Sequence, residues 1–362
     1  MQIPDPRIWR EPPADSRLHA LATASLAGNT AARAELRLSL DALFDAGDDD
    51  ALGAMLRDAP SAACYRHVRD IMALLINKPA RGETVIARLF AIPLVLVSGA
   101  KSRAVVSGAL PDVAAVSALL EKHGALGASR NFGLGNALCT IETLENLSPC
   151  ALRQWAAELR HEESQRGLVG SAIEVAPGRE QVLLRFLVGA SVAPAFSPSI
   201  TETAANIGAW GMPLTKLLAT QLAQPGLDLL PIPRPPAPLY LAADVGRAAQ
   251  IELSFSLFLS NSLRQFRMAV GDPTAIISAH RLDDGAAELR VSLSSAFDES
   301  LLEGFRWPLY PSDDISEIIN KINNLLNECK VGDVREVGTI EDEKTQRGGW
   351  FIRVQNSQAL TH

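Results

Sequence analysis

The residues best suited to chemistry gather around one histidine in the last third of the chain. His280 lies late in a predicted strand, beside Arg281 and close to Asp283 and Asp284. An imidazole titrates near neutral pH, and an arginine or carboxylate beside it can bind an anion or orient a proton transfer. The same residues also suit an ordinary polar hairpin tip, because turns are polar for solvation alone. The sequence leaves both interpretations open.

A second candidate is the aromatic sequence FRWPLY, residues 305–310, in a chain with only 5% aromatic residues. Trp307 and Tyr310 can line a groove, and Arg306 can bind an anion or stack on a ring. Alternatively, the aromatic side chains anchor a core, which is their commonest role. We take His280, Arg306, Trp307 and Tyr310 as a candidate groove for a ligand or partner, and we assign no catalytic residue.

The familiar metal and nucleotide motifs are missing from the sequence. The four cysteines are too far apart for a zinc or redox pair, and His161 lacks the second histidine of a zinc-protease motif. Gly133 and Gly135 lack the third small residue of a dinucleotide fingerprint, so we predict a loop there. We expect no bound metal and no cofactor.

Composition indicates a globular protein that does not bind nucleic acid generally. Of 362 residues, 47% are hydrophobic and 21% charged, and the formal net charge is −7. A general nucleic-acid binder normally carries a basic surplus. The longest uncharged apolar stretch, residues 89–100, is shorter than the roughly 20 residues of a membrane-spanning helix. With no secretory signal in the opening residues, we expect a cytoplasmic protein without a membrane segment.

The elements that must position the candidate residues follow from periodicity and end signals. Residues 15–77 show helical spacing with caps such as Asn29 and Ser61. Residues 84–99 and 182–192 are typical of buried strands, although Pro93 suits a central strand poorly. Two strand-like stretches joined at Asp283-Asp284-Gly285 predict a hairpin.

The next element is the most strongly amphipathic helix of the chain, which we expect Ser312 to cap. We predict an α/β or α+β fold, because strands and helices alternate after residue 80 and the hairpin excludes a purely parallel sheet. The expected segments are a helical one (1–80), two α/β units (81–180 and 181–337) and a C-terminal strand and tail (338–362).

The two central segments predict an internal β–α duplication. LPDVAAVSALLEKHG (110–124) aligns with MPLTKLLATQLAQPG (212–226), and an apolar stretch precedes each. On this alignment the proline-rich PIPRPPAP (231–238) takes the place of ASRNFGLGNA (128–137). We therefore expect the proline-rich stretch to be a rigid connection inside the fold, since proline fixes φ and removes donors. A domain linker and a docking peptide are the alternatives.

Three stretches together resemble a known bacterial family. LLRFLVGASVAPA, LDLLPIPRPPAPLY and RVSLSSAFDESLLEGFRWPLY are similar, in this order, to the proteobacterial family called domain of unknown function 2863. The resemblance covers roughly residues 35–337. It implies a bacterial cytoplasmic protein and carries over no activity, cofactor or site residue.

Two classes of function remain open. The first is a non-catalytic interaction or regulatory protein with a protein partner. The second is an enzyme or a binder of a small anionic ligand, with a site assembled from His280, Arg306, Trp307 and Tyr310. We favour the first, because no clustered acid–base set or metal-ligand spacing is visible.

Overall fold

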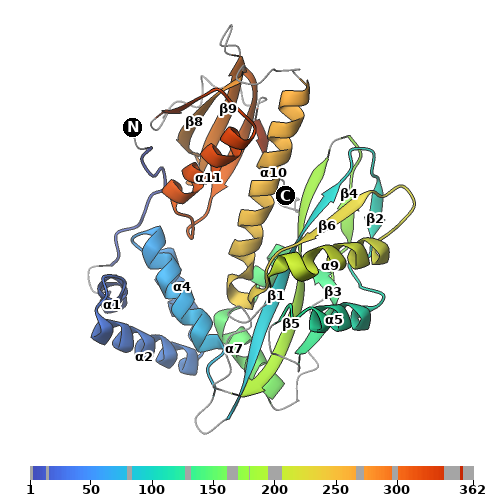
Figure 1. The fold of residues 1–362 in the computed structure, drawn as a ribbon. Coiled ribbons are helices and arrows are strands. Elements are labelled where there is room, and N and C mark those ends of the chain that lie inside the picture. Colours follow the sequence, from blue (N-terminus) through green and yellow to red (C-terminus); the bar gives the residue numbers. More distant parts are fainter. Residues whose placement is uncertain are drawn as a thin grey trace. The chain divides into compact units, whose positions relative to one another are not determined.

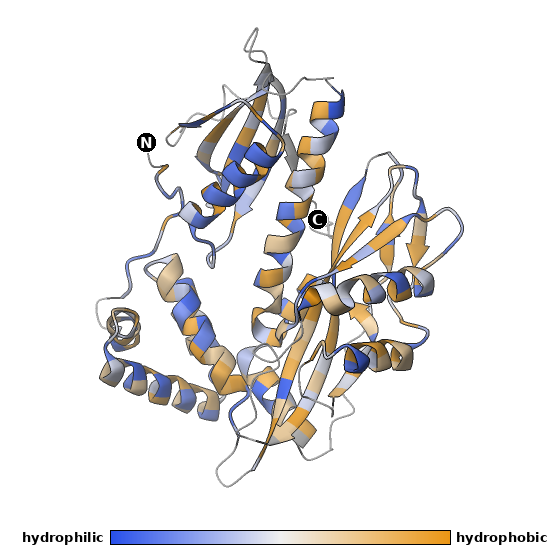
Figure 2. Cartoon of the chain, in the orientation of Figure 1, coloured by the Kyte–Doolittle hydropathy of each residue, from blue (hydrophilic) through white to orange (hydrophobic). Residues whose placement is uncertain are grey.

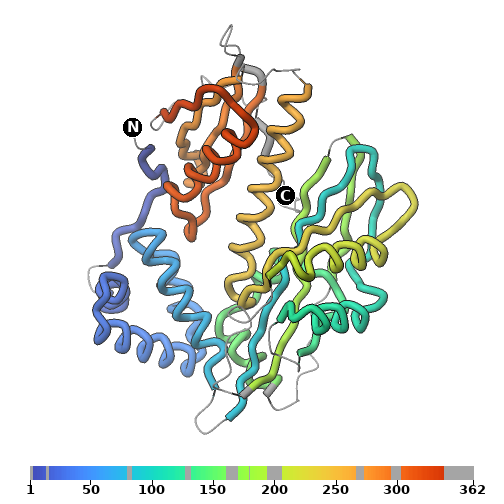
Figure 3. The backbone as a smooth tube through the Cα atoms, viewed as in Figure 1, coloured from blue at the N-terminus to red at the C-terminus, as the bar shows by residue number. Residues whose placement is uncertain are grey.

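The computed structural model describes residues 3–13, 16–79, 84–126, 132–160, 170–178, 180–194, 206–265, 273–295, 301–337 and 351–353. The chain forms two compact units (Figures 1 and 3). Among the described residues, unit 1 comprises those up to Ser16, Asp58–Arg66 and those from Ile251 onward, and unit 2 comprises those within Arg17–Arg57 and His67–Gln250. Each unit is assembled from separate stretches, so the units do not coincide with the four consecutive segments predicted. The mixture of helices and strands confirms the predicted α/β or α+β class.

Four helices form where the N-terminal sequence predicts them: α1 (Arg17–Leu26), α2 (Thr30–Ala46), α3 (Asp49–Arg57) and α4 (Ala62–Ile76). Asn29 caps α2 by accepting from the Ala32 amide, and Gly47 ends it at a φ of 70°. Ser61 accepts from the Cys64 amide at the start of α4. These caps supply partners that the first amides of a helix otherwise lack.

The sheet of unit 2 is built on a central antiparallel pair. β1 (Val85–Ser98) pairs with β5 (Gln181–Pro194) without a break. β3 (Phe132–Cys139) flanks β5, and β6 (Leu229–Pro233) flanks β1, which gives the order β3-β5-β1-β6. The short strands β2 (Ala104–Val106) and β4 (Ile173–Val175) pair separately. Figure 2 shows hydrophobic residues along both central strands, as expected where both faces are buried.

Helices cover both faces of this sheet. α5 (Val113–Lys122) and α9 (Ile207–Gln221) pack on one face, where Val116, Leu120, Trp210, Leu214 and Leu218 join the core with Ile92 and Leu94.

α6 (Ile141–Glu145), α7 (Pro149–Arg160) and the first part of α10 (Leu239–Gln265) belong to the other face. There a Cβ on Gly246 would come within 2.7 Å of the Phe186 ring, so only glycine permits this close approach.

The proline-rich stretch is an edge strand within unit 2. Residues Leu229–Pro233 and Ala237–Pro238 (β6 and β7) pair with β1. The Arg234 amide donates to the Pro93 carbonyl at 2.8 Å, so the alternation of the strand turns the donor-free nitrogens of Pro231 and Pro233 away from β1. The stretch lies inside the fold, as predicted, but it is itself a paired edge strand and not the connection between elements that the sequence analysis expects. It is neither a domain linker nor a free docking peptide.

The same geometry explains Pro93 in a central strand. In an antiparallel strand the N–H and C=O of one residue point to the same neighbour. The carbonyl of Pro93 faces the three residues between the end of β6 and the start of β7. The missing donor of Pro93 therefore falls in the gap between two paired segments.

The sheet of unit 2 consists of two strand–helix–strand halves with the same order and direction. β1 and β3 both run antiparallel to β5, and β5 and β6 both pair antiparallel with their neighbour β1. This β-α-β-β-α-β order is the ferredoxin-like arrangement. Gly124 directly follows the C-cap of α5 with a φ of 63°, whereas Gly226, with a φ of 77°, lies in a separate turn after α9 has ended at Gln221.

The flanking strands are also interrupted at equivalent places. The pairing of β3 with β5 breaks between Leu134 and Leu138, and the pairing with β1 breaks between Pro233 and Ala237. Order, direction and interruptions agree with what the predicted duplication requires. The common origin of the halves stays a prediction.

Residues predicted as a loop around Gly133 and Gly135 belong to strand β3 instead. Glycine is a poor strand former, but Phe132, Gly133 and Leu134 pair with β5. Tertiary pairing therefore decides the conformation here and overrides the local preference for a turn.

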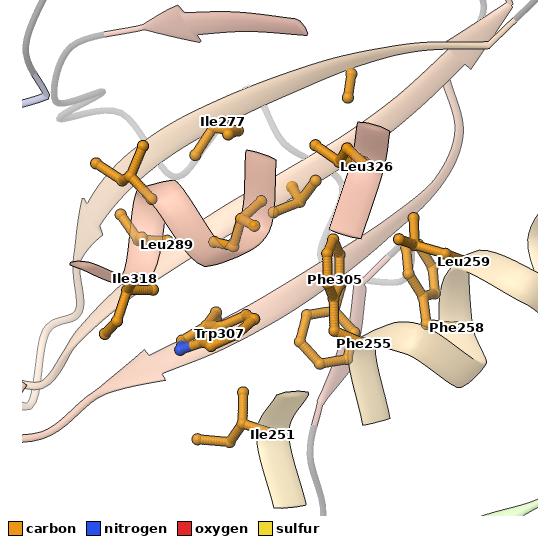
Figure 4. Close-up of a cluster of buried hydrophobic side chains, with 14 of the residues drawn as sticks. Ile251, Phe255, Phe258, Leu259, Ile277, Leu289, Phe305, Trp307, Ile318 and Leu326 are labelled. Carbon is orange, nitrogen blue, oxygen red and sulfur yellow. The ribbon is translucent and has the colours of Figure 1, made fainter. Parts of the chain in front are cut away.

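Unit 1 contains a second sheet in the order β11-β8-β9-β10-β12. Its strands are β8 (Pro273–Arg281), β9 (Ala287–Ser295), β10 (Leu301–Leu309), β11 (Asp333–Val337) and β12 (Phe351–Arg353). The predicted hairpin joins β8 to β9, with Gly285 at a φ of 82°. The C-terminal part of α10 and α11 (Ile315–Glu328) pack on one face, and Figure 4 shows their side chains meeting those of the sheet.

The cap of α11 is Asp314, and the expectation that Ser312 caps this helix is wrong. The Asp314 carboxylate accepts from the amides of Ser316 and Glu317 at 2.9 and 3.1 Å. The neighbouring Asp313 carboxylate accepts a hydrogen bond from the Tyr310 amide at 2.7 Å. A carboxylate beside a helix N-terminus also interacts favourably with the helix dipole.

Candidate functional site

The polar face of the second sheet carries a cluster of charged side chains. Strand alternation places one set of residues toward the helices and the other set on the opposite face. In the strand register, Ser278 of β8 lies opposite Arg290 of β9, which lies opposite Arg306 of β10. In the next row of the same face, His280 of β8 lies opposite Glu288 of β9. Because directly opposed residues in a sheet share a face, these five side chains lie together. We call them the charged cluster.

All five members of the charged cluster are buried. The exposed fraction is 1% for Ser278, His280 and Arg290, 5% for Glu288 and 8% for Arg306. The Arg290 Nε donates to Glu288 Oε1 at 2.6 Å, and Arg306 Nε lies 3.8 Å from the same oxygen. Buried charges need such pairing because the desolvation of an isolated ion is costly.

His280 is held in its neutral form within the charged cluster. Burial lowers its pKa to about 4, and the positive charges of Arg290 and Arg306 act in the same direction. Its Nε2 lies 2.8 Å from the Ser278 hydroxyl. Its Nδ1 is buried and has no hydrogen-bond partner among the described residues. A neutral imidazole with one free nitrogen can accept or donate one further hydrogen bond, depending on its tautomer.

The structure divides the predicted groove between the two faces of the sheet. His280 and Arg306 meet on the polar face, as the functional hypothesis requires. Trp307 is 3% exposed in the core on the other face, with its ring centroid 5.8 Å from that of Phe255 (Figure 4). Tyr310 also packs against that core. Trp307 therefore does not border a groove with His280, because adjacent strand residues point to opposite faces.

Sequence reasoning missed Ser278, Glu288 and Arg290. The signal was present in AELRVSLSS (287–295), where polar residues recur at every second position. Such alternation predicts that one face of the strand is polar. Asp283 and Asp284, which are close to His280 in sequence, lie at the exposed hairpin turn and are not part of the charged cluster.

His67, Cys139 and Cys150 have surroundings that are typical of structural side chains and not of reactive ones. His67 Nε2 lies 2.7 Å from the buried Ser25 hydroxyl, and burial followed by the charge of Arg33 lowers its pKa. Burial raises the pKa of Cys139 to about 11, and burial with the Asp49 contact raises that of Cys150 to about 12. These thiols are protonated at neutral pH and are poor nucleophiles. His161 and His362 lie outside the described residues.

Within the described part of the chain, no three histidine, cysteine or acidic side chains gather in a way that would hold a metal. None of the described helices has the length and apolarity needed to cross a bilayer.

Comparison with known proteins places the chain in no group. No protein family, no curated protein and no solved structure matches it.

Proposed function

We propose that this protein is a non-catalytic interaction or regulatory protein. The observation that carries the proposal is the burial of the charged cluster. The groups best suited to acid–base chemistry lie at 1–8% exposure, and the arginines bond inward to Glu288. Catalytic groups must reach their substrate within hydrogen-bond distance. A buried, ion-paired cluster of this kind supports a structural role, because buried polar networks can rigidify a sheet and specify its pairing.

The alternative function is an enzyme or a binder of a small anionic ligand at His280 and Arg306. The free Nδ1 of His280 favours this alternative, because buried polar atoms usually have a partner. Trp307 and Tyr310 do not support it, since Trp307 belongs to the core on the opposite face and Tyr310, which is partly buried, packs against that core.

A ligand screen with a matched variant separates the two functions. Ligands that bind only the folded state raise its melting temperature. We would screen nucleotides, acyl-CoA species, phosphorylated metabolites and metal ions against the native protein and His280→Gln. The proposal predicts no stabilisation that depends on His280. A compound that stabilises the native protein by several degrees and leaves His280→Gln unchanged would establish the alternative.

We also propose that the chain is a member of the family called domain of unknown function 2863, that it is bacterial and that it is cytoplasmic. These proposals rest on the sequence resemblance and on the composition of the chain. None of them supplies an activity.

A further inference from the structure

Residues 3–9 contact the rest of unit 1 as a separate peptide would. Ile3 is 3% exposed and belongs to the core between the second sheet and its helices. Arg7 Nη1 donates to the Tyr310 carbonyl at 2.6 Å, 303 residues away in sequence. In return, Arg281 Nε donates to the Pro6 carbonyl at 2.8 Å. The segment therefore has two buried apolar residues, Ile3 and Pro6, and two reciprocal arginine–carbonyl bonds.

Arg7 is preorganised for this contact by its own neighbours. Its Nε and Nη2 donate to Asp5 at 2.9 and 2.6 Å. The Trp9 indole donates to the same carboxylate at 3.2 Å, and the Arg7 guanidinium lies 4.7 Å from the Trp9 ring centroid. A side chain already fixed in its bound geometry loses little entropy on binding.

The anchor points form one footprint at one end of the second sheet. β8 and β10 are both antiparallel to β9, so they run in the same direction and end at the same edge. Arg281 is the last residue of β8, and Tyr310 directly follows β10. The footprint presents a donor from one strand end, a carbonyl acceptor from the other, and an apolar position for Ile3.

Residues 3–9 can leave this footprint without breaking the sheet. Among the described residues, no backbone–backbone hydrogen bond joins this segment to the strands of unit 1. The sheet ladders therefore remain complete when the segment departs. The cost of release is the exposure of Ile3 and Pro6 and the loss of the two arginine–carbonyl bonds.

We propose that this footprint is a peptide-binding site occupied in cis by residues 3–9. Its partner is an extended segment of another protein with an aliphatic residue followed four positions later by an arginine, as Ile3 is followed by Arg7. The inference rests on the proposed function, because it names the class of partner. The footprint recognises the aliphatic side chain by burial and the arginine by the carbonyl of Tyr310.

The test is binding of a synthetic peptide in trans. Residues 1–9 are deleted from the chain, and a fluorescent peptide of residues 1–10, MQIPDPRIWR, is titrated while its anisotropy is measured. The truncated chain is expected to bind one peptide, and the intact chain to bind it at least tenfold more weakly because its site is filled. A peptide with Arg7→Ala is expected to lose about tenfold or more in affinity, as is the truncated chain with Arg281→Ala.

Several outcomes would overturn the proposal. One is a folded truncated chain that binds neither peptide, or binds both equally. Another is dimerisation of the intact chain that the peptide reverses, which would assign the site to a second copy. If the truncated chain does not fold, hydrogen exchange on the intact chain decides. Amides of residues 3–9 should then exchange well before those of β9, and exchange only on global unfolding would show a fixed part of the fold. Failure here leaves the ligand screen of the proposed function unaffected.

Discussion

Replacing His280 with glutamine should flatten the acid dependence of stability. The pKa of His280 is about 4 in the folded protein, whereas an unperturbed imidazole has a pKa of about 6.5. This difference corresponds to about 3 kcal/mol of folding free energy. Because the folded-state pKa is lowered, the contribution is fully present above pH ~6.5 and is lost as the pH falls toward ~4.

The assay is denaturant unfolding of the native protein and His280→Gln at several pH values between 7.5 and 4.5. His67 also has a lowered pKa and acts in the same direction, so only the difference between the two proteins isolates His280. The free energy of unfolding of the native protein should fall by about 2–3 kcal/mol more than that of the variant over this range. Parallel pH profiles, or an NMR titration of His280 with a pKa near 6.5, would refute the burial of this imidazole.

Three further substitutions or reactions test other parts of the structure. Trp307→Ala should lower the free energy of unfolding by about 3–5 kcal/mol, because it empties a core position. Met212→Ala, at a site that is 63% exposed, is the control and should change this free energy by less than about 0.5 kcal/mol. Similar values for the two variants would place Trp307 outside the core. Asp314→Ala should cost about 1 kcal/mol through the lost cap and Ser312→Ala almost nothing, with the reverse order in thermal unfolding contradicting the cap assignment. At pH 8, Cys139 and Cys150 should be alkylated much more slowly than a free thiol because their pKa values are raised, and labelling of the native protein at the free-cysteine rate would contradict their environments.

The sequence predicts the elements better than it predicts the site. Caps and periodicity locate the N-terminal helices, the two long strands and the hairpin, because these signals are local. The assignment of Gly133 and Gly135 to a loop fails because β5 supplies the pairing from distant sequence. The discontinuous units arise for the same reason: residues 3–9 pack with strands about 300 positions away.

The candidate site shows a similar limit. Strand alternation in residues 273–281 and 287–295 was sufficient to predict a polar face with His280. It could not show that Arg290 and Glu288 would lie beside it, because the register of β8, β9 and β10 depends on tertiary pairing. Trp307 and Arg306 are adjacent in sequence, and strand alternation places their side chains on opposite faces of the sheet.

The central claim is that the charged cluster is sealed and does not meet a substrate. Acylation of histidines by diethyl pyrocarbonate, mapped by mass spectrometry on the native protein, tests it most directly. The reagent attacks neutral imidazole, and His280 is neutral at pH 7, so protection would report access alone. The account predicts that His280 stays unmodified while the partly exposed His123 reacts. Modification of His280 at the rate of His123 would contradict the sealed cluster and favour an accessible binding or catalytic site.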